Sequence, residues 1–217
     1  MNKLFSILVL SLLVLANGFV GTTSSFADGH EQTQMESAGK DKMGMDDEMM
    51  NKWMEYATPN ENHKVLDALV GEWDYALKWW KAPGIKPEQS TGTSKIKWIM
   101  DGRFIKHKVE GTSMGMPFMG MPFKGMGITG YNNETNKYES VWIDNMGTGM
   151  VKGSGSYDAE TKTLTEIGTF SCLGEGDKKY HAVIIYTNID SFMYQWYMPG
   201  PDKKQYLAMV INYTRKK

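Results

Sequence analysis

The chain has 217 residues, a formal net charge of −1 at pH 7 and a hydrophobic content of 41%. A charge so close to zero provides no electrostatic basis for binding nucleic acid, which proteins recognise with clustered Lys and Arg. The single cysteine, Cys172, excludes an internal disulfide.

The first 27 residues have the pattern of a bacterial signal peptide. Lys3 gives a positive start, residues 4–20 are apolar, and Ser25-Phe26-Ala27 fits the small-x-small rule for cleavage. An uncleaved membrane anchor is less well supported, because the apolar run is short and contains Ser and Asn. We therefore expect cleavage after residue 27, a location in the periplasm or outside the cell, and no stable membrane insertion.

Two segments lie between the signal peptide and the strand-like part of the chain. Residues 28–46 are mostly small and polar with scattered Met, so we expect a disordered tether. Residues 47–70 predict a helical cap made of two short helices. The first carries Met49 and Trp53 at helical spacing, and the second runs over Glu61–Leu69. We expect this pair to cover one end of the following domain, 71–217.

From Gly71 onward the hydrophobic pattern alternates with a period of two, which is typical of β-strands. The expected strands are 72–80, 90–100, 103–112, 123–132, 137–145, 149–158, 162–171, 179–188, 191–198 and 204–215. Turn residues such as Asp101-Gly102 separate them. This order predicts an all-β fold, a closed antiparallel up-and-down barrel of about ten strands, because closure removes open sheet edges. A sandwich of two sheets is the alternative.

Alternation also predicts which side chains face the barrel interior. Lys106 and Lys108 place one face of the third strand in solvent, so His107 faces inward. The same reasoning gives a mixed aromatic and polar interior made of Trp98, His107, Trp142, Asp144, Tyr194 and Trp196. This mixture suits a binding pocket for a small apolar molecule. A filled barrel whose polar atoms pair with one another, as in a structural envelope protein, is an equal alternative.

Several short motifs occur in order along the chain: Trp53–Pro59, His63, Leu69–Trp73, Gly102–Phe104, Met121–Phe123, Gly130–Asn132 and Trp142–Asp144. Together they resemble the bacterial exported family called domain of unknown function 1579, from about residue 49 to the C-terminus. The resemblance implies a lipocalin-like (calycin) barrel and no established activity. The chain departs from the family pattern in one place, where Met114–Phe118 is followed by a second copy, Met119–Phe123.

The wider calycin resemblance implies one structural contact. In such barrels the opening Trp packs against an Arg of the final strand, and here the pair would be Trp73 and Arg215. A stacked guanidinium is worth on the order of 1 kcal/mol when desolvated. The alternative is that Arg215, next to Lys216 and Lys217, belongs to a basic tail.

We expect no metal ion or cofactor, with copper and haem as alternatives. Methionine accounts for 18 residues, and thioether sulfurs select Cu(I). A copper site would use Met114, Met116, Met119 and Met121. Against copper, no histidine is close in sequence, and Met also fills gaps in cores. Haem would use the inward-facing His107, although a buried histidine more often pairs with a polar neighbour.

No catalytic motif is present, and we assign no enzymatic activity. The segment Gly125–Gly130 imitates a dinucleotide-binding Gly-x-Gly-x-x-Gly string, but no helix follows it. We expect its glycines to permit curvature and bulges in the barrel. Asp144 is expected to pair with the backbone of a turn. The leading hypothesis is an exported carrier of a small apolar or aromatic molecule.

Overall fold

The computed structural model describes residues 47–113 and 120–217. The predicted signal peptide (1–27) and tether (28–46) lie outside the described residues. Met114, Met116 and Met119 of the predicted copper site also lie outside them. The helical segments are α1 (Asp47–Ala57), α2 (Glu61–Lys64) and the 3-10 helix η1 (Val65–Leu69).

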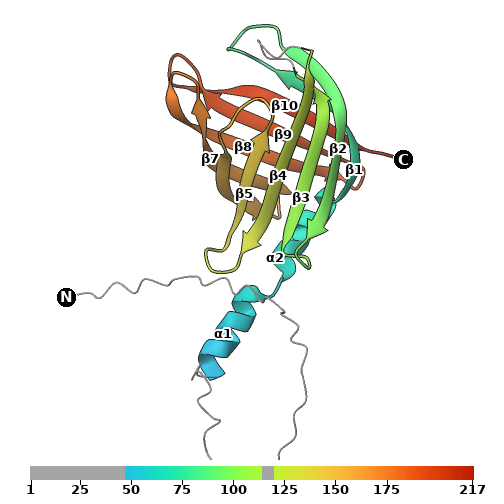
Figure 1. The fold of residues 1–217 in the computed structure, drawn as a ribbon, viewed down its shortest axis with the longest axis vertical. Coiled ribbons are helices and arrows are strands. Elements are labelled where there is room, and N and C mark those ends of the chain that lie inside the picture. The colour runs from blue at the N-terminus through green and yellow to red at the C-terminus, as the bar shows by residue number, and fades with distance from the viewer. Residues whose placement is uncertain (1–46, 114–119) are drawn as a thin grey trace, which may run out of the picture. The chain divides into compact units, whose positions relative to one another are not determined.

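Ten strands follow the helices: β1 (Gly71–Trp79), β2 (Glu88–Ile99), β3 (Phe104–Thr112), β4 (Pro122–Asn132), β5 (Lys137–Asp144), β6 (Val151–Asp158), β7 (Thr163–Cys172), β8 (Gly176–Asn188), β9 (Ser191–Pro199) and β10 (Gln205–Arg215). Each strand pairs antiparallel with the next, and β1 also pairs with β10, so the sheet closes (Figure 1). The predicted closed up-and-down barrel is confirmed, and the two-sheet sandwich is wrong.

The strands and turns follow the sequence pattern. In β1 the side chains of Trp73 and Tyr75 are buried, whereas Asp74 between them is exposed. In the β4–β5 and β6–β7 turns, Asn132 and Asp158 each accept backbone N–H groups from residues two and three positions later. These local hydrogen bonds are the reason Asn and Asp favour such turns.

The turn between β2 and β3 shifts one predicted boundary. Met100 and Asp101 have positive φ angles of 51° and 54°, and Gly102 follows at 82°. The N–H of Arg103 then donates to the carbonyl oxygen of Met100 at 3.3 Å. Arg103 therefore belongs to the turn, and β3 begins at Phe104 rather than at Arg103 as the alternation predicts.

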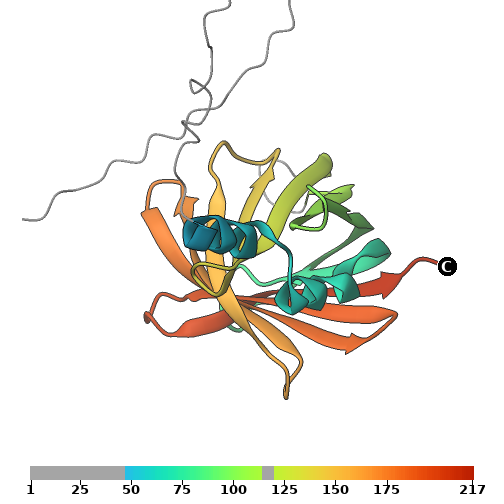
Figure 2. The ribbon, with the colours of Figure 1, turned by 90° about the horizontal axis from the view of Figure 1, so that it is seen from below.

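One end of the barrel is covered by α2 and η1. The chain changes from α to 3-10 geometry at Val65, which divides the predicted helix Glu61–Leu69 into two. Residues three apart eclipse each other in a 3-10 helix, so Leu66 and Leu69 share one face, and both are buried in the core. Figure 2 views the barrel from this end.

The first helix is placed differently from the expectation. No residue of α1 is buried, and Met49 and Trp53 remain about half exposed. The amide nitrogen of Asn133, in the β4–β5 turn, donates to carbonyl oxygens of the last turn of α1, including that of Glu55 at 3.0 Å. The structure therefore fastens the C-terminus of α1 without burying its apolar stripe. No helix among the described residues is long and apolar enough to cross a membrane.

The seam between β1 and β10 carries the contact that the calycin resemblance implies. Trp73 pairs with Arg215 across the seam, and the guanidinium carbon lies 4.1 Å from the centroid of the indole ring system. Arg215 also donates from Nη1 to the carbonyl oxygen of Val70 and from Nε to that of Ile189. The Trp73 side chain is fully buried and donates from Nε1 to the carbonyl oxygen of Leu69 at 2.9 Å. One arginine thus links η1, β1 and the β8–β9 turn.

Candidate functional site

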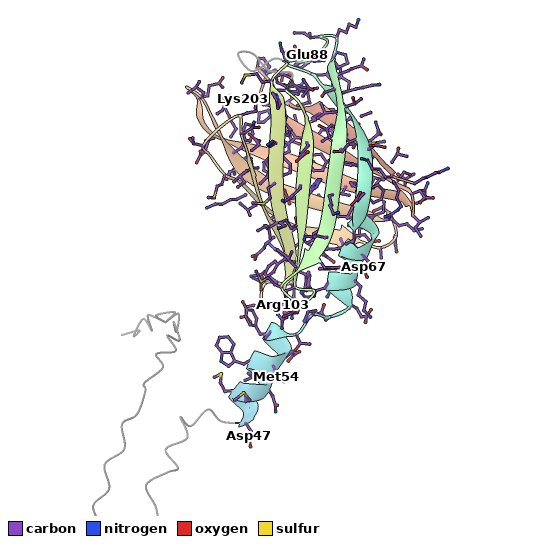
Figure 3. The ribbon with its side chains drawn as sticks, turned by 45° about the vertical axis from the view of Figure 1, so that its right-hand side comes forward. Asp47, Met54, Asp67, Glu88, Arg103 and Lys203 are labelled. Atoms are coloured by element: carbon purple, nitrogen blue, oxygen red, sulfur yellow. The ribbon has the colours of Figure 1, made fainter. Side chains whose placement is uncertain are left out.

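The two ends of the barrel can be followed in Figure 3. Asp67 and Arg103 are labelled at the end that carries η1, here called the helical end. Glu88 and Lys203 are labelled at the opposite end, here called the far end. The inward side chains of the strands lie between these two levels.

A cavity of about 670 Å³ lies inside the barrel. Its wall includes Leu69 at the helical end and Trp79 and Phe123 towards the far end. This volume falls within the range of roughly 300–1,000 Å³ that is usual for small-molecule sites. The side chains of the described residues therefore leave the barrel open, unlike the filled barrel that the sequence allows as an alternative.

All but one of the predicted ligand-binding residues line this cavity. They are His107, Trp142, Asp144, Tyr194 and Trp196. Trp98 shares the inward face of β2, but it lies near the helical end, where its Nε1 donates to the Asp67 carboxylate of η1 at 2.8 Å. The structure thus brings the other five together and assigns Trp98 a contact with the cap.

His107 projects from β3 into the middle of the barrel. Its Nε2 lies 2.7 Å from the hydroxyl of Ser94 on the neighbouring strand β2. The ring packs edge-on against Trp142 and Tyr213, with centroid distances of 5.7 and 6.0 Å. Burial lowers the pKa of His107 to about 4, so the imidazole is neutral at pH 7.

The Trp142 indole is held by a carboxylate on one side and two glycines on the other. Its Nε1 donates to Asp144 Oδ2 at 2.9 Å, and Asp144 Oδ1 accepts the backbone N–H of Met146. A Cβ at Gly125 would overlap the indole, and one at Gly127 would press on it. The expected role of Asp144 as a partner of turn backbone is confirmed. The expectation of bulges in β4 is wrong, because β4 pairs with β3 and β5 without a shift in register.

A carboxylate that the sequence interpretation missed also lines the cavity. Glu166 on β7 accepts hydrogen bonds from the Ser140 hydroxyl at 2.5 Å and from the Tyr180 hydroxyl. The Tyr180 ring stacks on Trp196 at 3.9 Å between centroids. A Cβ at Gly153 would collide with both Glu166 and Tyr180, so this glycine makes room for the pair.

The alternation in β7 contains a weak signal for Glu166. The residue shares a face with the buried Leu164, whereas Ile167 points outward and is 63% exposed. An isoleucine outside and a glutamate inside reverse the usual hydrophobic pattern, so the sequence of β7 favours neither face. The pairing of β7 with β6 and β8 determines that the Glu166 side chain faces the barrel interior.

The metal and haem alternatives remain predictions. Among the described residues, no group of three or more His, Cys, Asp or Glu side chains is placed to hold a metal ion. Met121, the described member of the methionine set, precedes β4 and is about half exposed. His107, the candidate haem ligand, has its Nε2 in a hydrogen bond with Ser94.

The fold and the cavity define the class of protein, a calycin-like up-and-down barrel with an internal cavity. Residues 58–215 match the model of a family described as "Protein of unknown function (DUF1579)". Because this match covers most of the chain, the protein belongs to that family. A search of curated proteins finds no match.

Solved structures that match this chain include one crystal structure of a natural protein and one redesigned barrel. The crystal structure of Rv2717c from M. tuberculosis is 15% identical with a TM-score of 0.53, and the match covers 74% of this chain and 100% of that chain. A redesigned beta barrel, b11L5F_LGL, is 14% identical with a TM-score of 0.38, covering 71% of this chain and 96% of that chain. At these identities the first likeness concerns the fold alone.

Proposed function

We propose that this protein binds a small apolar or aromatic molecule inside its barrel. The observation that carries the proposal is the cavity of about 670 Å³, whose wall is mainly aromatic and aliphatic. The aromatic part of the wall includes Tyr75, Trp142, Tyr180, Tyr194, Trp196 and Tyr213. A concave, mostly apolar surface with a few polar groups is the usual form of a small-molecule site.

The polar groups on the wall would orient such a ligand through hydrogen bonds. Burial raises the pKa of Tyr213, and burial together with nearby negative charge raises that of Tyr194. Both hydroxyls therefore stay protonated at neutral pH and can donate or accept. His107 is neutral under the same conditions and offers a ring nitrogen. The two tyrosine hydroxyls and the His107 ring would therefore select ligands by shape and hydrogen-bond pattern, and they add no charge to the wall.

The N-terminal 27 residues support export, so the ligand would be bound in the periplasm or outside the cell. We expect the mature chain to begin at Asp28 and to have no stable insertion in the membrane. N-terminal mass spectrometry of protein isolated from its own host tests this location. An intact Met1 on the major species would contradict cleavage of a signal peptide after residue 27.

Ligand binding can be tested with the neutral fluorescent probe N-phenyl-1-naphthylamine. We expect saturable fluorescence enhancement with the unmodified protein. Leu77→Trp adds bulk to a side chain that lines the cavity, and it should weaken probe binding about tenfold, on the order of 1.4 kcal/mol. The matched control Ala76→Trp changes the next residue of β1, which faces outward, and should leave the affinity within about twofold.

Circular dichroism of both variants checks that the barrel has folded. If the unmodified protein gives no saturable enhancement, or if Leu77→Trp binds the probe as well as Ala76→Trp, the proposal is wrong.

A further inference from the structure

The charges on the cavity wall have one sign. Asp144 and Glu166 both line the cavity, and no Lys or Arg is among the described residues of its wall. The remaining base, His107, is neutral at pH 7 because burial lowers its pKa to about 4. The interior of the barrel therefore carries negative charge without a basic side chain to balance it.

Both oxygens of the Glu166 carboxylate accept hydrogen bonds from side-chain hydroxyls. Its Oε2 accepts the Ser140 hydroxyl at 2.5 Å, and its Oε1 accepts the Tyr180 hydroxyl. An ionised carboxylate only accepts hydrogen bonds, and its two oxygens provide about four acceptor sites. Two donors therefore leave Glu166 with acceptor capacity for a further partner inside the cavity.

Asp144 is committed to local structure. One of its oxygens accepts the Trp142 indole N–H, and the other accepts the Met146 backbone N–H. These bonds hold the indole against β4 and close the turn after β5. The partners of both carboxylates line the cavity. Those of Asp144 lie two residues away in sequence, whereas Glu166 accepts hydroxyl groups from two other strands, Ser140 on β5 and Tyr180 on β8.

The Glu166 carboxylate is bonded to one member of a group of neighbouring aromatic side chains. The Tyr180 ring, which donates to Glu166, stacks on Trp196 with an interplanar angle of 10°. Tyr194 lies 6.4 Å from Trp196 between ring centroids, and burial, followed by the charge of Glu166, raises the pKa of Tyr194. Aromatic faces attract cations, and the attraction strengthens where water is excluded.

We propose that the cavity selects organic cations: molecules with an apolar or aromatic body and a protonated amine that binds at Glu166. This inference rests on the proposed function and adds the charge of the ligand to it. Glu166 has hydrogen-bond donors but no opposite charge among the described residues of the cavity wall, and an ammonium group would supply that charge. The same carboxylates repel anionic ligands, so fatty acids and other carboxylates are disfavoured.

Three ligands that share one ring system separate charge from shape: 1-naphthylmethylamine, 1-naphthalenemethanol and 1-naphthoate. Isothermal titration at pH 7 should show the amine binding about tenfold or more tightly than the alcohol, and the naphthoate binding more weakly than either. Glu166→Gln keeps the size of the side chain and an acceptor oxygen. It should weaken amine binding about tenfold while changing alcohol binding less than about threefold.

The matched control is Glu110→Gln, which removes the same charge from the outer, exposed face of β3 and should change neither affinity. Equal affinities for amine and alcohol, or unchanged amine binding in Glu166→Gln, would overturn the selection of cations. Binding of the alcohol and of the neutral naphthylamine probe would then still support an apolar carrier. If the unmodified protein binds neither the naphthyl ligands nor the fluorescent probe, the proposed function itself is rejected.

Discussion

Single residues inside the barrel are placed by neighbours that lie far away in sequence. Gly125 and Gly127 leave the space that the Trp142 indole occupies, and Gly153 does the same for Glu166. In each case the missing side chain lies on the strand next to the bulky one. Small residues opposite large ones are a general means of filling a barrel interior evenly.

His107 gives the stability of the barrel a defined pH dependence. An unfolded histidine has a pKa of about 6.5, and burial in the barrel lowers that of His107 to about 4. Between these values the unfolded chain binds more protons than the folded one. Stability conferred by the neutral ring is therefore complete above about pH 6.5 and decreases as the pH falls towards 4, by up to roughly 3 kcal/mol.

Urea unfolding at pH 7.5 and pH 4.5 measures this effect when the unmodified protein is compared with His107→Gln. Between pH 7.5 and pH 4.5 the free energy of unfolding should fall further in the unmodified protein than in His107→Gln. The difference between the two decreases should be about 1–3 kcal/mol. The other titrating groups are common to both proteins, so their contributions cancel in the difference. An identical decrease in both proteins would show that His107 is not the cause.

At the scale of elements, the two helical segments before the barrel have different roles. The side chains of Leu66 and Leu69 in η1 enter the core, and the Trp73 indole donates to the η1 backbone. In contrast, α1 buries no side chain, and Asn133 holds it by hydrogen bonds to backbone carbonyls at its C-terminus. Tertiary burial, more than helical propensity, stabilises short helices. We therefore expect η1 and not α1 to support the barrel.

A chain that begins at Thr58 tests this difference. Its free energy of unfolding should lie within about 1 kcal/mol of the longer chain, because no buried contact is removed. Leu66→Ala, at a side chain with no exposed surface, should cost about 2–5 kcal/mol. Urea unfolding measures both changes. A truncated chain destabilised as much as Leu66→Ala would show that α1 is structurally required.

Across the whole molecule, the strand pairings differ in length. The β5–β6 pairing extends only from Tyr138 with Gly155 to Trp142 with Val151. The β7–β8 pairing covers the whole of β7, from Thr163 to Cys172. A short pairing in which β6 contributes glycines has few buried apolar contacts, and such regions open first in native proteins. The β5–β6 seam is therefore the weakest part of the closed barrel.

Hydrogen exchange followed by mass spectrometry locates this seam. Peptides from β6 should exchange faster than peptides from β8 under native conditions, because local opening exposes their amides without global unfolding. The amides of β8 serve as the internal control, because β8 pairs with β7 over the whole length of β7. Equal protection of the two strands would mean that the barrel opens only as a unit.

The sequence by itself determined the fold class, because alternation, turn residues and the absence of long helices after Gly71 all favour a meander that must close. It also placed His107, Trp142 and Trp196 on the inner face. Alternation, however, identifies the face of a strand and not the level along the barrel axis. Trp98 and His107 both point inward, yet one meets η1 and the other lines the cavity.

Only the tertiary structure decided what each inward residue contacts. Glu166 could not be assigned to the interior, because Ile167 and Leu164 in β7 support opposite faces. The exposure of α1 was equally hidden, since an apolar stripe predicts burial only when another surface covers it. Local pattern specifies the strands and their turns, whereas strand register determines which side chains meet across the barrel. The open cavity and its negative charge arise from that register.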